Sequence, residues 1–224
     1  MRTIYHGSDH EIRKPIYHGG RKHNDYGYGF YCTENIDLAK EWSVQGNVDG
    51  IINIYNIDDS NLKILYLNKK PYGLLNWLAI LLNNRTIDLN SYLAIDAQNY
   101  ILNNFLVDYK NYDVIVGYRA DDSYFAFAED FLKGAISYRQ LNSAFSLGKL
   151  GLQYVLISKL AHERIIYVGK EDVSKEEWFP KLIIRDHNAR MDYHNFEKNR
   201  RKPGDIFITN IIDEGMKQND KRLQ

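Results

Sequence analysis

Residues 25–33, DYGYGFYCT, carry the pattern from which the fold of this chain is best approached. Two glycines alternate there with aromatic residues and lead into the strand-like FYCT. Glycine at such positions predicts a sharp bend or a close approach of the backbone, and the neighbouring rings offer flat surfaces. The next residues, Thr33-Glu34-Asn35, suit a helix start, and the apolar face that follows includes Trp42. The stretch predicts a strand, a turn and a helix in succession.

The segments on either side mix strands and helices. Strands are expected at 1–5, 51–57, 62–67, 152–158 and 164–170, and a further one is expected to begin at residue 179. Residues 112–122 are expected to form an apolar strand that runs into a charged turn. Helices are expected at 73–84, 91–107, 123–134 and 137–151. These elements do not alternate as in regular βαβ units, which favours the α+β class over a doubly wound fold. We expect one domain over residues 1–224, with a helical insertion at about 71–108 left open.

Composition and charge limit the class of protein. Cys32 is the only cysteine, which excludes an internal disulfide framework and a cysteine-based zinc site. Lys and Arg total 29 against 29 for Asp and Glu, so overall charge favours neither nucleic acid nor an anionic membrane as partner. The apolar run at 74–82 falls short of the roughly 20 residues that span a bilayer. No secretory signal is visible at the start of the chain. A soluble, cytoplasmic protein without membrane contact is expected.

Common catalytic and metal-binding motifs are missing from the sequence. The seven histidines form no HExxH pair, and no metal site is predicted. GxGxxG, GxxxxGK[ST] and GxSxG do not occur, which argues against a dinucleotide fold, a P-loop and a nucleophile elbow. The basic run KNRRK at 198–202 favours a solvated loop over a phosphate site. The chemistry therefore has to be sought elsewhere.

The N-terminal part of the chain offers one set of candidate residues. His6 and Gly7 stand at the end of the first expected strand, where they suit a polar ligand bound edge-on. Tyr31 and Trp42 flank a strand-to-helix turn and suit a slot for a flat ring. From the residues alone, a strand-end histidine and two core aromatics remain the simpler interpretation.

Taken as a set, YHGS (5–8), DYGYGFYCT (25–33) and AKEW (39–42) resemble motifs of the ADP-ribosyltransferase superfamily of the diphtheria-toxin and poly(ADP-ribose) polymerase type. There a His-Gly-Ser or His-Gly-Thr strand precedes a glycine-rich segment with a tyrosine, and a second aromatic follows at the spacing that separates Tyr31 from Trp42. With 14–15, 112–122 and 152–158 in the same order, the chain resembles a bacterial family of uncharacterised ADP-ribosyltransferase-like proteins. The resemblance implies split antiparallel β-sheets around an NAD cleft, with flanking helices.

The resemblance also implies a role for each matching residue. His6 would bind the 2′-hydroxyl of the nicotinamide ribose, and Gly7 would hold the nicotinamide amide through its backbone. Tyr31 and Trp42 would sandwich the nicotinamide ring. In the family a glutamate on a later strand contacts the same ribose, and Gln153 occupies its place here. His6, Tyr31 and Gln153 are therefore the expected catalytic set.

The remaining candidates are residues that could bind the adenosine and pyrophosphate parts of NAD, and carboxylates that could replace the glutamate absent at position 153. Ser8 and Arg21 are expected on the adenosine side, Arg21 because a guanidinium suits a pyrophosphate or an adenine face. Gln153 keeps a hydrogen-bond acceptor but lacks the charge that would stabilise an oxocarbenium ion. Asp121 and Asp122, after an apolar strand, are candidate replacement carboxylates. A solvated turn that caps the next helix is their equally open alternative.

The activity implied by the resemblance is that of an NAD-dependent mono-ADP-ribosyltransferase with NAD as co-substrate. Nicotinamide is released, and ADP-ribose passes to a macromolecular acceptor, for which the neutral charge favours a protein over a nucleic acid. By family analogy the setting is a bacterial toxin of a toxin–antitoxin or phage-defence system, with an antitoxin protein as partner. An NAD glycohydrolase and a catalytically degenerate module that binds NAD or ADP-ribose remain alternatives. An RNA 2′-phosphotransferase is disfavoured because no arginine cluster surrounds the motifs.

Overall fold

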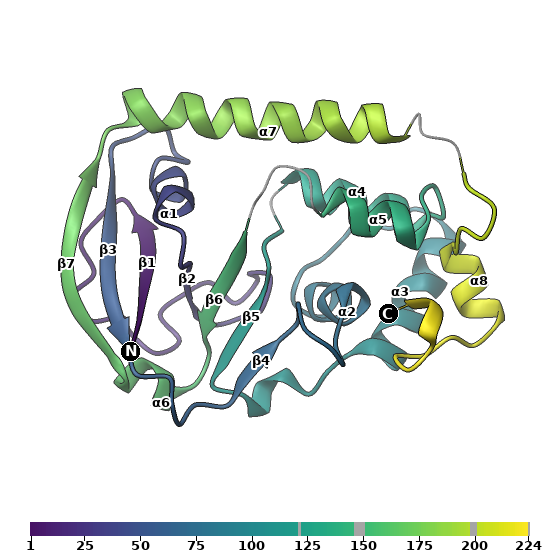
Figure 1. Ribbon diagram of the computed structural model, residues 1–224, viewed down its shortest axis with the longest axis horizontal. Helices are drawn as coiled ribbons and strands as arrows, with labels where there is room; N and C mark the ends of the chain where they lie inside the picture. The colour runs from purple at the N-terminus through teal and green to yellow at the C-terminus, as the bar shows by residue number, and fades with distance from the viewer. Residues whose placement is uncertain (121, 146–150, 198–200, 224) are drawn as a thin grey trace.

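The computed structural model describes residues 1–120, 122–145, 151–197 and 201–223, with the backbone alone at 122–124, 194, 196 and 197. Within these residues the chain forms a three-stranded sheet and a four-stranded sheet with α-helices around them (Figure 1). The predicted α+β class is confirmed. None of the helices in the described part of the chain has the length and apolar character needed to cross a membrane.

The first sheet has the order β1-β3-β7 and is antiparallel throughout. Its strands span Arg2–Ser8, Gly50–Ile57 and Ile165–Val173. Helix α1, Ile36–Ser43, packs against β1 and β3. Asn35 is its N-cap, and the Asn35 Oδ1 accepts from the backbone N–H groups of Asp37 at 2.9 Å and Leu38 at 3.3 Å. The helix thus begins where the sequence predicts it, because this side chain satisfies its first N–H groups.

The second sheet has the order β2-β6-β5-β4, with strands at Phe30–Cys32, Leu152–Leu156, Val114–Tyr118 and Ile64–Tyr66. β4 and β5 are parallel, so the expectation of purely antiparallel sheets is wrong for this pair. Parallel neighbours need a crossover connection. Helices α2 (Leu74–Asn84) and α3 (Tyr92–Phe105) and a 3-10 turn at Tyr109–Asn111 form it. The helical segment 71–108 is therefore the link between adjacent strands.

The two sheets meet at one isolated bridge between β1 and β2. The Tyr5 N–H donates to the Thr33 carbonyl at 2.8 Å, and the Thr33 N–H donates to the Tyr5 carbonyl at 2.9 Å. In a continued antiparallel ladder the next hydrogen-bonded pair would be Gly7 and Tyr31. Instead, the Tyr31 carbonyl accepts from His6 Nδ1 at 2.7 Å. The His6 side chain takes the place of a ladder bond, and β1 and β2 separate there.

The largest apolar core lies between the second sheet and the helices on the side of it that is away from the first sheet. Besides α2 and α3, these helices are α4 (Asp122–Leu132), α5 (Tyr138–Ala144) and α8 (Ile208–Asp213). Trp77 of α2 lies at the centre of this core with no exposed surface. Its ring packs edge-on against Phe145 and Tyr118, with centroids 4.5 and 6.3 Å away. Short turns at α6 (Lys159–Glu163) and Lys221–Leu223 complete the described elements.

Helix α7, Lys175–Glu197, lies across the molecule and contacts α1 at one end and α4 and α5 towards the other (Figure 1). The strand expected to begin at residue 179 is wrong. The apolar run at 182–184 suggests a strand, but Ile183 and Ile184 are exposed on the helix, and Ala189 and Tyr193 are buried at helical spacing. Arg185 donates from Nε to Glu41 Oε2 of α1 at 2.5 Å. The helix thereby braces α1.

Candidate functional site

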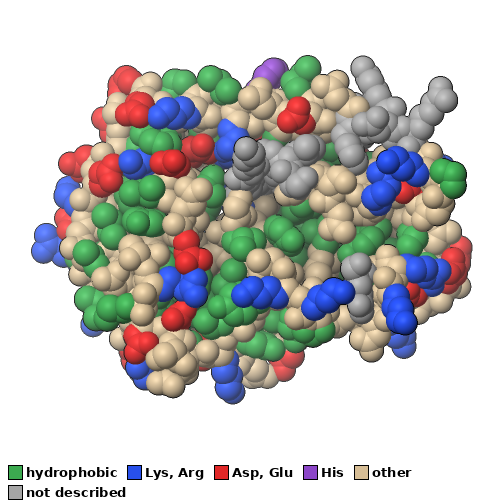
Figure 2. Space-filling model, viewed as in Figure 1, with side chains coloured by type: hydrophobic (Ala, Val, Ile, Leu, Met, Phe, Trp, Pro, Cys, Tyr) green, Lys and Arg blue, Asp and Glu red, His purple; other side chains and the backbone are tan. Residues whose placement is uncertain are grey.

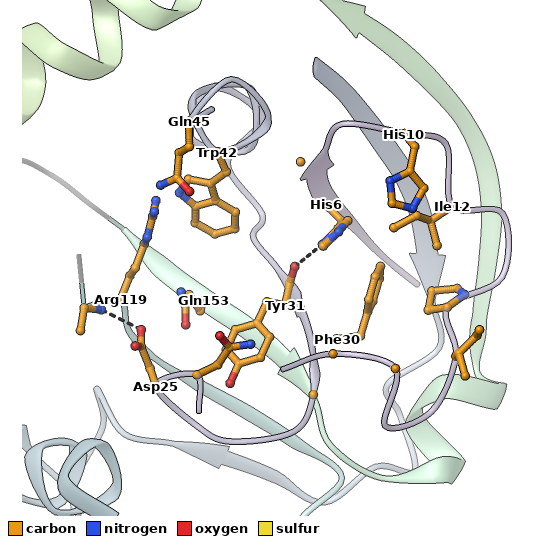
Figure 3. Close-up of a pocket in the computed structure, with 18 of the residues that line it drawn as sticks. His6, His10, Ile12, Asp25, Phe30, Tyr31, Trp42, Gln45, Arg119 and Gln153 are labelled. Carbon is orange, nitrogen blue, oxygen red and sulfur yellow. Dashed lines mark hydrogen bonds between the residues drawn. The ribbon is translucent and has the colours of Figure 1, made fainter. Parts of the chain in front are cut away.

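A cavity of about 590 Å³ opens where β1 and β2 separate. Both sheets, α1 and the loop between β1 and β2 contribute to its wall (Figure 3). Its volume lies in the range of pockets that bind small molecules. Five residues singled out from the sequence line it: His6, Gly7, Tyr31, Trp42 and Gln153. They come from four elements that are distant in the sequence.

The imidazole of His6 is held in one orientation. Nδ1 lies 2.7 Å from the Tyr31 carbonyl oxygen, which can only accept, so Nδ1 carries the proton. The ring also packs against Phe30, with centroids 4.4 Å apart. Burial lowers the pKa of His6 below 6.5, against the opposing effect of its bond to the Tyr31 carbonyl. The neutral ring leaves Nε2 as an acceptor for a hydroxyl group.

The lowered pKa of His6 predicts sensitivity to acid. Between this pKa and 6.5 the unfolded chain binds more protons at His6 than the folded chain, so the free energy of unfolding falls as pH drops. Burial lowers the pKa of His162 as well, which adds in the same direction. We expect urea denaturation between about pH 7.5 and about pH 5 to show a shallower fall in His6→Gln than in the wild type. The exposed His187 gives the control variant, His187→Gln, and an unchanged slope in His6→Gln would contradict this prediction.

The phenol of Tyr31 is fixed at its hydroxyl. The hydroxyl donates to the Gly27 carbonyl at 2.7 Å and accepts from the Tyr26 N–H at 3.1 Å. Burial raises the pKa of Tyr31 far above its ordinary value, so the phenol stays neutral. Tyr31 therefore offers its ring face to the cavity. Its hydroxyl is occupied and does not act as an acid or a base.

Gly7 contributes backbone groups and a close contact. On the β1 edge that faces β2, its N–H and C=O follow those of Tyr5, and no described backbone group of β2 pairs with them. They can therefore bind a planar amide. A Cβ at this position would lie 2.1 Å from the Ala39 carbonyl oxygen and 2.9 Å from the Ser43 nitrogen, both in α1. Glycine lets α1 lie directly on β1, which brings Trp42 to the cavity.

Trp42 and Arg119 form a stacked pair in the wall. The guanidinium carbon of Arg119 lies 4.7 Å from the Trp42 ring centroid, a cation–π contact. Trp42 Nε1 is buried and has no hydrogen-bond partner among the described residues. In Figure 3, Trp42 and Tyr31 face the same space from α1 and β2. Sequence reasoning missed Arg119, whose only signal was a basic residue directly after an apolar strand.

Gln153 of β6 lies in the same wall and is 6% exposed. Its Oε1 is buried without a hydrogen-bond partner in the described part of the chain. Such an atom costs roughly 1–3 kcal/mol when it stays unsatisfied. In a cavity of this size the unsatisfied oxygen indicates that a polar ligand completes the site.

A buried ion pair that the sequence did not reveal joins three segments around the cavity. Asp25 is 5% exposed, and its Oδ1 accepts from Arg85 Nη1 at 3.2 Å. Its Oδ2 accepts from the Ala120 N–H at 2.9 Å, shown in Figure 3. The loop before β2, the end of α2 and the turn after β5 are held together in this way. Asp25 had a signal, a charge at the start of the glycine–aromatic stretch, whereas Arg85 had none.

The cavity differs in charge from the rest of the molecule. On the face shown in Figure 2, basic and acidic side chains are interspersed, as the formal net charge of +0 predicts. The described cavity wall instead holds Lys14, Arg85 and Arg119 against one carboxylate, Asp25. This excess of cations favours an anionic ligand. Within the described residues no group of three or more His, Cys, Asp or Glu side chains is placed to hold a metal ion.

Two expected site residues, Ser8 and Arg21, are absent from the described part of the cavity wall. Ser8 accepts from Asn53 Nδ2 at 2.9 Å and so helps to hold the loop after β1. Arg21 is exposed on the loop between β1 and β2. The structure thus does not bring either to the cavity. Asp121 lies outside the described residues, and of Asp122 only the backbone, at the start of α4, is described.

Comparison with known proteins gives one match. A family model described as "Protein of unknown function (DUF3990)" matches residues 2–167. No curated protein and no solved structure matches the chain. The matched range includes every cavity residue named above and ends within β7. Helices α7 and α8 lie beyond it.

Proposed function

This chain belongs to the DUF3990 family of proteins of unknown function, and we propose that it is an NAD-dependent mono-ADP-ribosyltransferase. It releases nicotinamide from NAD and transfers ADP-ribose to a macromolecular acceptor. The observation that carries the proposal is the cavity at the separation of β1 and β2. There His6, Gly7, Tyr31, Trp42 and Gln153, the residues that resemble the motifs of that superfamily, share one wall.

The cavity suits a ligand that combines a flat ring, a sugar and phosphates. Tyr31 and Trp42 offer ring surfaces for nicotinamide. The backbone of Gly7 suits the carboxamide, and the neutral Nε2 of His6 suits a ribose hydroxyl. The two arginines of the wall, with their fork of N–H donors, suit the pyrophosphate.

The chemistry asked of the site is the cleavage of one glycosidic bond. The bond between C1′ and the nicotinamide nitrogen breaks, its electron pair leaves with nicotinamide, and C1′ gains oxocarbenium character. A nucleophilic group of the acceptor then bonds to C1′, and its proton passes to water. His6 holds the ribose in place while C1′ flattens, which contributes by positioning. Gln153, at the place of the family's glutamate, favours a single transfer over chain elongation.

The proposed setting is that of a bacterial toxin in a toxin–antitoxin or phage-defence system. The proposed acceptor is a protein, and an antitoxin protein is the proposed partner. The resemblance supports the toxin role by analogy. The formal net charge of +0 supports a protein over a nucleic acid, because nucleic-acid binding depends strongly on cationic contacts with phosphates.

Purified protein incubated with NAD labelled on the adenosine side tests the proposal. Nicotinamide release and transfer of label to bacterial lysate are measured together. We expect release and transfer by the wild type, and a rate at least about tenfold lower in His6→Ala, because a hydrogen bond at the reacting ribose is lost. The control is His187→Ala, an exposed histidine on α7, which is expected to react like the wild type.

Two other results would replace this function by a different one, and a third would refute it. Nicotinamide release without transfer to any lysate component indicates an NAD glycohydrolase. NAD binding without release indicates a binding module, in which Gln153 marks lost chemistry. If NAD neither binds nor reacts, the proposal is wrong.

A further inference from the structure

We infer that Asp25 supplies the negative charge of the site, in place of the carboxylate that position 153 lacks. The inference rests on the proposed function, because it concerns the same cleavage of NAD. It assigns the stabilisation of positive charge at C1′ to a residue of the loop before β2. In the family motif that task falls to the strand that carries Gln153.

The first support is the placement of Asp25. Among the described residues of the cavity wall it is the only carboxylate. It is 5% exposed, so little water screens its charge. Both of its oxygens accept hydrogen bonds, from Arg85 at 3.2 Å and from the Ala120 N–H at 2.9 Å. Donors of this kind stabilise the ionised carboxylate and fix its orientation.

The second support is that the charge of Asp25 acts on the ligand-facing wall. Burial is the main cause that raises the pKa of Tyr31, and its hydrogen bond with the Tyr26 backbone lowers it. The negative charge of Asp25 raises this pKa, whereas the positive charge of Arg85, a smaller effect, lowers it. The pKa of the neighbouring Tyr26 is raised in the same way, first by burial and then by Asp25. A negative charge that opposes the ionisation of a nearby phenol also favours a cation at a similar distance. The Tyr31 ring is a wall of that space.

The third support is that the transition state of the proposed reaction carries positive charge. As nicotinamide leaves, C1′ gains positive charge, and fixed charges aimed at that position lower the barrier. The Gln153 amide offers a dipole there, which is weaker than a full charge at the same distance. Asp25 is the one carboxylate among the described residues of this wall, so it is the group there that can supply a full negative charge.

Asp25 also has a structural part, which the experiment has to separate. Asp25→Asn keeps the size of the side chain and one carbonyl oxygen, and it removes the charge. Asp205 provides a matched control. Its side chain is 4% exposed and pairs with Arg139 at 2.7 and 2.9 Å, and it is absent from the cavity wall. Asp205→Asn therefore removes a buried, paired carboxylate away from the site.

The test measures nicotinamide release from NAD by the purified full-length chain. We expect the kcat of Asp25→Asn to fall about tenfold with KM within about threefold of the wild type, because the lost interaction forms mainly in the transition state. Adding Gln153→Glu to Asp25→Asn is expected to restore kcat to within about threefold of the wild type. A merely structural role would not be restored by a carboxylate on another strand. Asp205→Asn is expected to react like the wild type.

Gln153→Glu alone keeps the inference testable if Asp25→Asn does not fold. With Asp25 already charged, this variant is expected to raise kcat by less than about threefold. A rise of about tenfold or more would show that the site lacks a carboxylate, and the inference would be wrong. An Asp25→Asn that reacts like the wild type would also overturn it, and both results leave the proposed function standing. A wild type that releases no nicotinamide overturns the proposed function and the inference with it.

Discussion

Trp77→Ala is expected to lower the free energy of unfolding by about 4 kcal/mol, because a fully buried tryptophan is replaced by a cavity. Trp77 packs edge-on against Phe145 and Tyr118. Its Nε1 donates to the Tyr118 carbonyl at 2.9 Å, so the substitution also leaves that carbonyl with one donor fewer. The Trp77 side chain thus links the largest apolar core to the end of β5. Urea denaturation followed by far-UV circular dichroism measures the loss in the free energy of unfolding.

Trp178 supplies the matched control for this prediction. It lies on α7 and is partly exposed, and the ammonium nitrogens of Lys181 and Lys40 are 3.8 and 5.2 Å from its ring centroid. We expect Trp178→Ala to cost about 1 kcal/mol, since exposed cation–π contacts are weak. Equal losses in the two variants would contradict the central place of Trp77 in the core.

Gly7→Ala is expected to destabilise the chain by roughly 3 kcal/mol, the upper part of the range for overpacked sites. The added Cβ would lie 2.1 Å from the Ala39 carbonyl oxygen, a contact with helix backbone that no rotamer change can relieve. Helix α1 has to move away from β1. Because α1 carries Trp42, the movement also displaces one wall of the cavity, and we expect the proposed NAD cleavage to fall together with stability.

Gly169 of β7 is the matched glycine for this test. It lies in the same sheet, has no atom within 4 Å of an added Cβ and has an ordinary φ. Gly169→Ala is expected to be neutral or to stabilise the chain by up to about 1 kcal/mol through the unfolded state. If Gly7→Ala unfolds at the same urea concentration as Gly169→Ala, the close packing of α1 on β1 is wrong.

The elements nearest the cavity could be predicted because their signals are local. Asn35 caps α1 through its own side chain, and the glycine–aromatic stretch leads into β2 as expected. The resemblance also singled out His6, Tyr31 and Gln153, which the fold brings to one wall. Their roles towards NAD stay predictions.

The rest of the site could not be predicted because it depends on contacts between distant segments. Asp25 and Arg85 are 60 residues apart in the chain, and Asp25 and Ala120 are 95 apart. No periodicity or capping rule relates such positions. Arg119 joins the wall only because β5 ends beside α1, an arrangement that depends on how the two sheets meet.

Two misjudged elements have related causes. In α7 the exposed Ile183 and Ile184 concealed the helical period, and the buried residues described in its second half are the small Ala189 and the polar-tipped Tyr193. The antiparallel direction expected for β4 and β5 came from the resemblance, and the sequence could not correct it because a short apolar strand reads the same in both directions. Its orientation depends on the helices that follow it.

The crossover between β4 and β5 has a consequence for how this architecture can vary. β4 and β5 are parallel, so the chain has to return from the end of β4 to the edge of the sheet where β4 began before it can form β5. Helices α2 and α3 make this return and cannot simply be deleted. Arg85 stands at the end of α2, on that return path, and reaches Asp25 in the cavity wall. A related chain can therefore exchange the whole return path for another, and keep this site, only if the replacement delivers a cation to the same carboxylate.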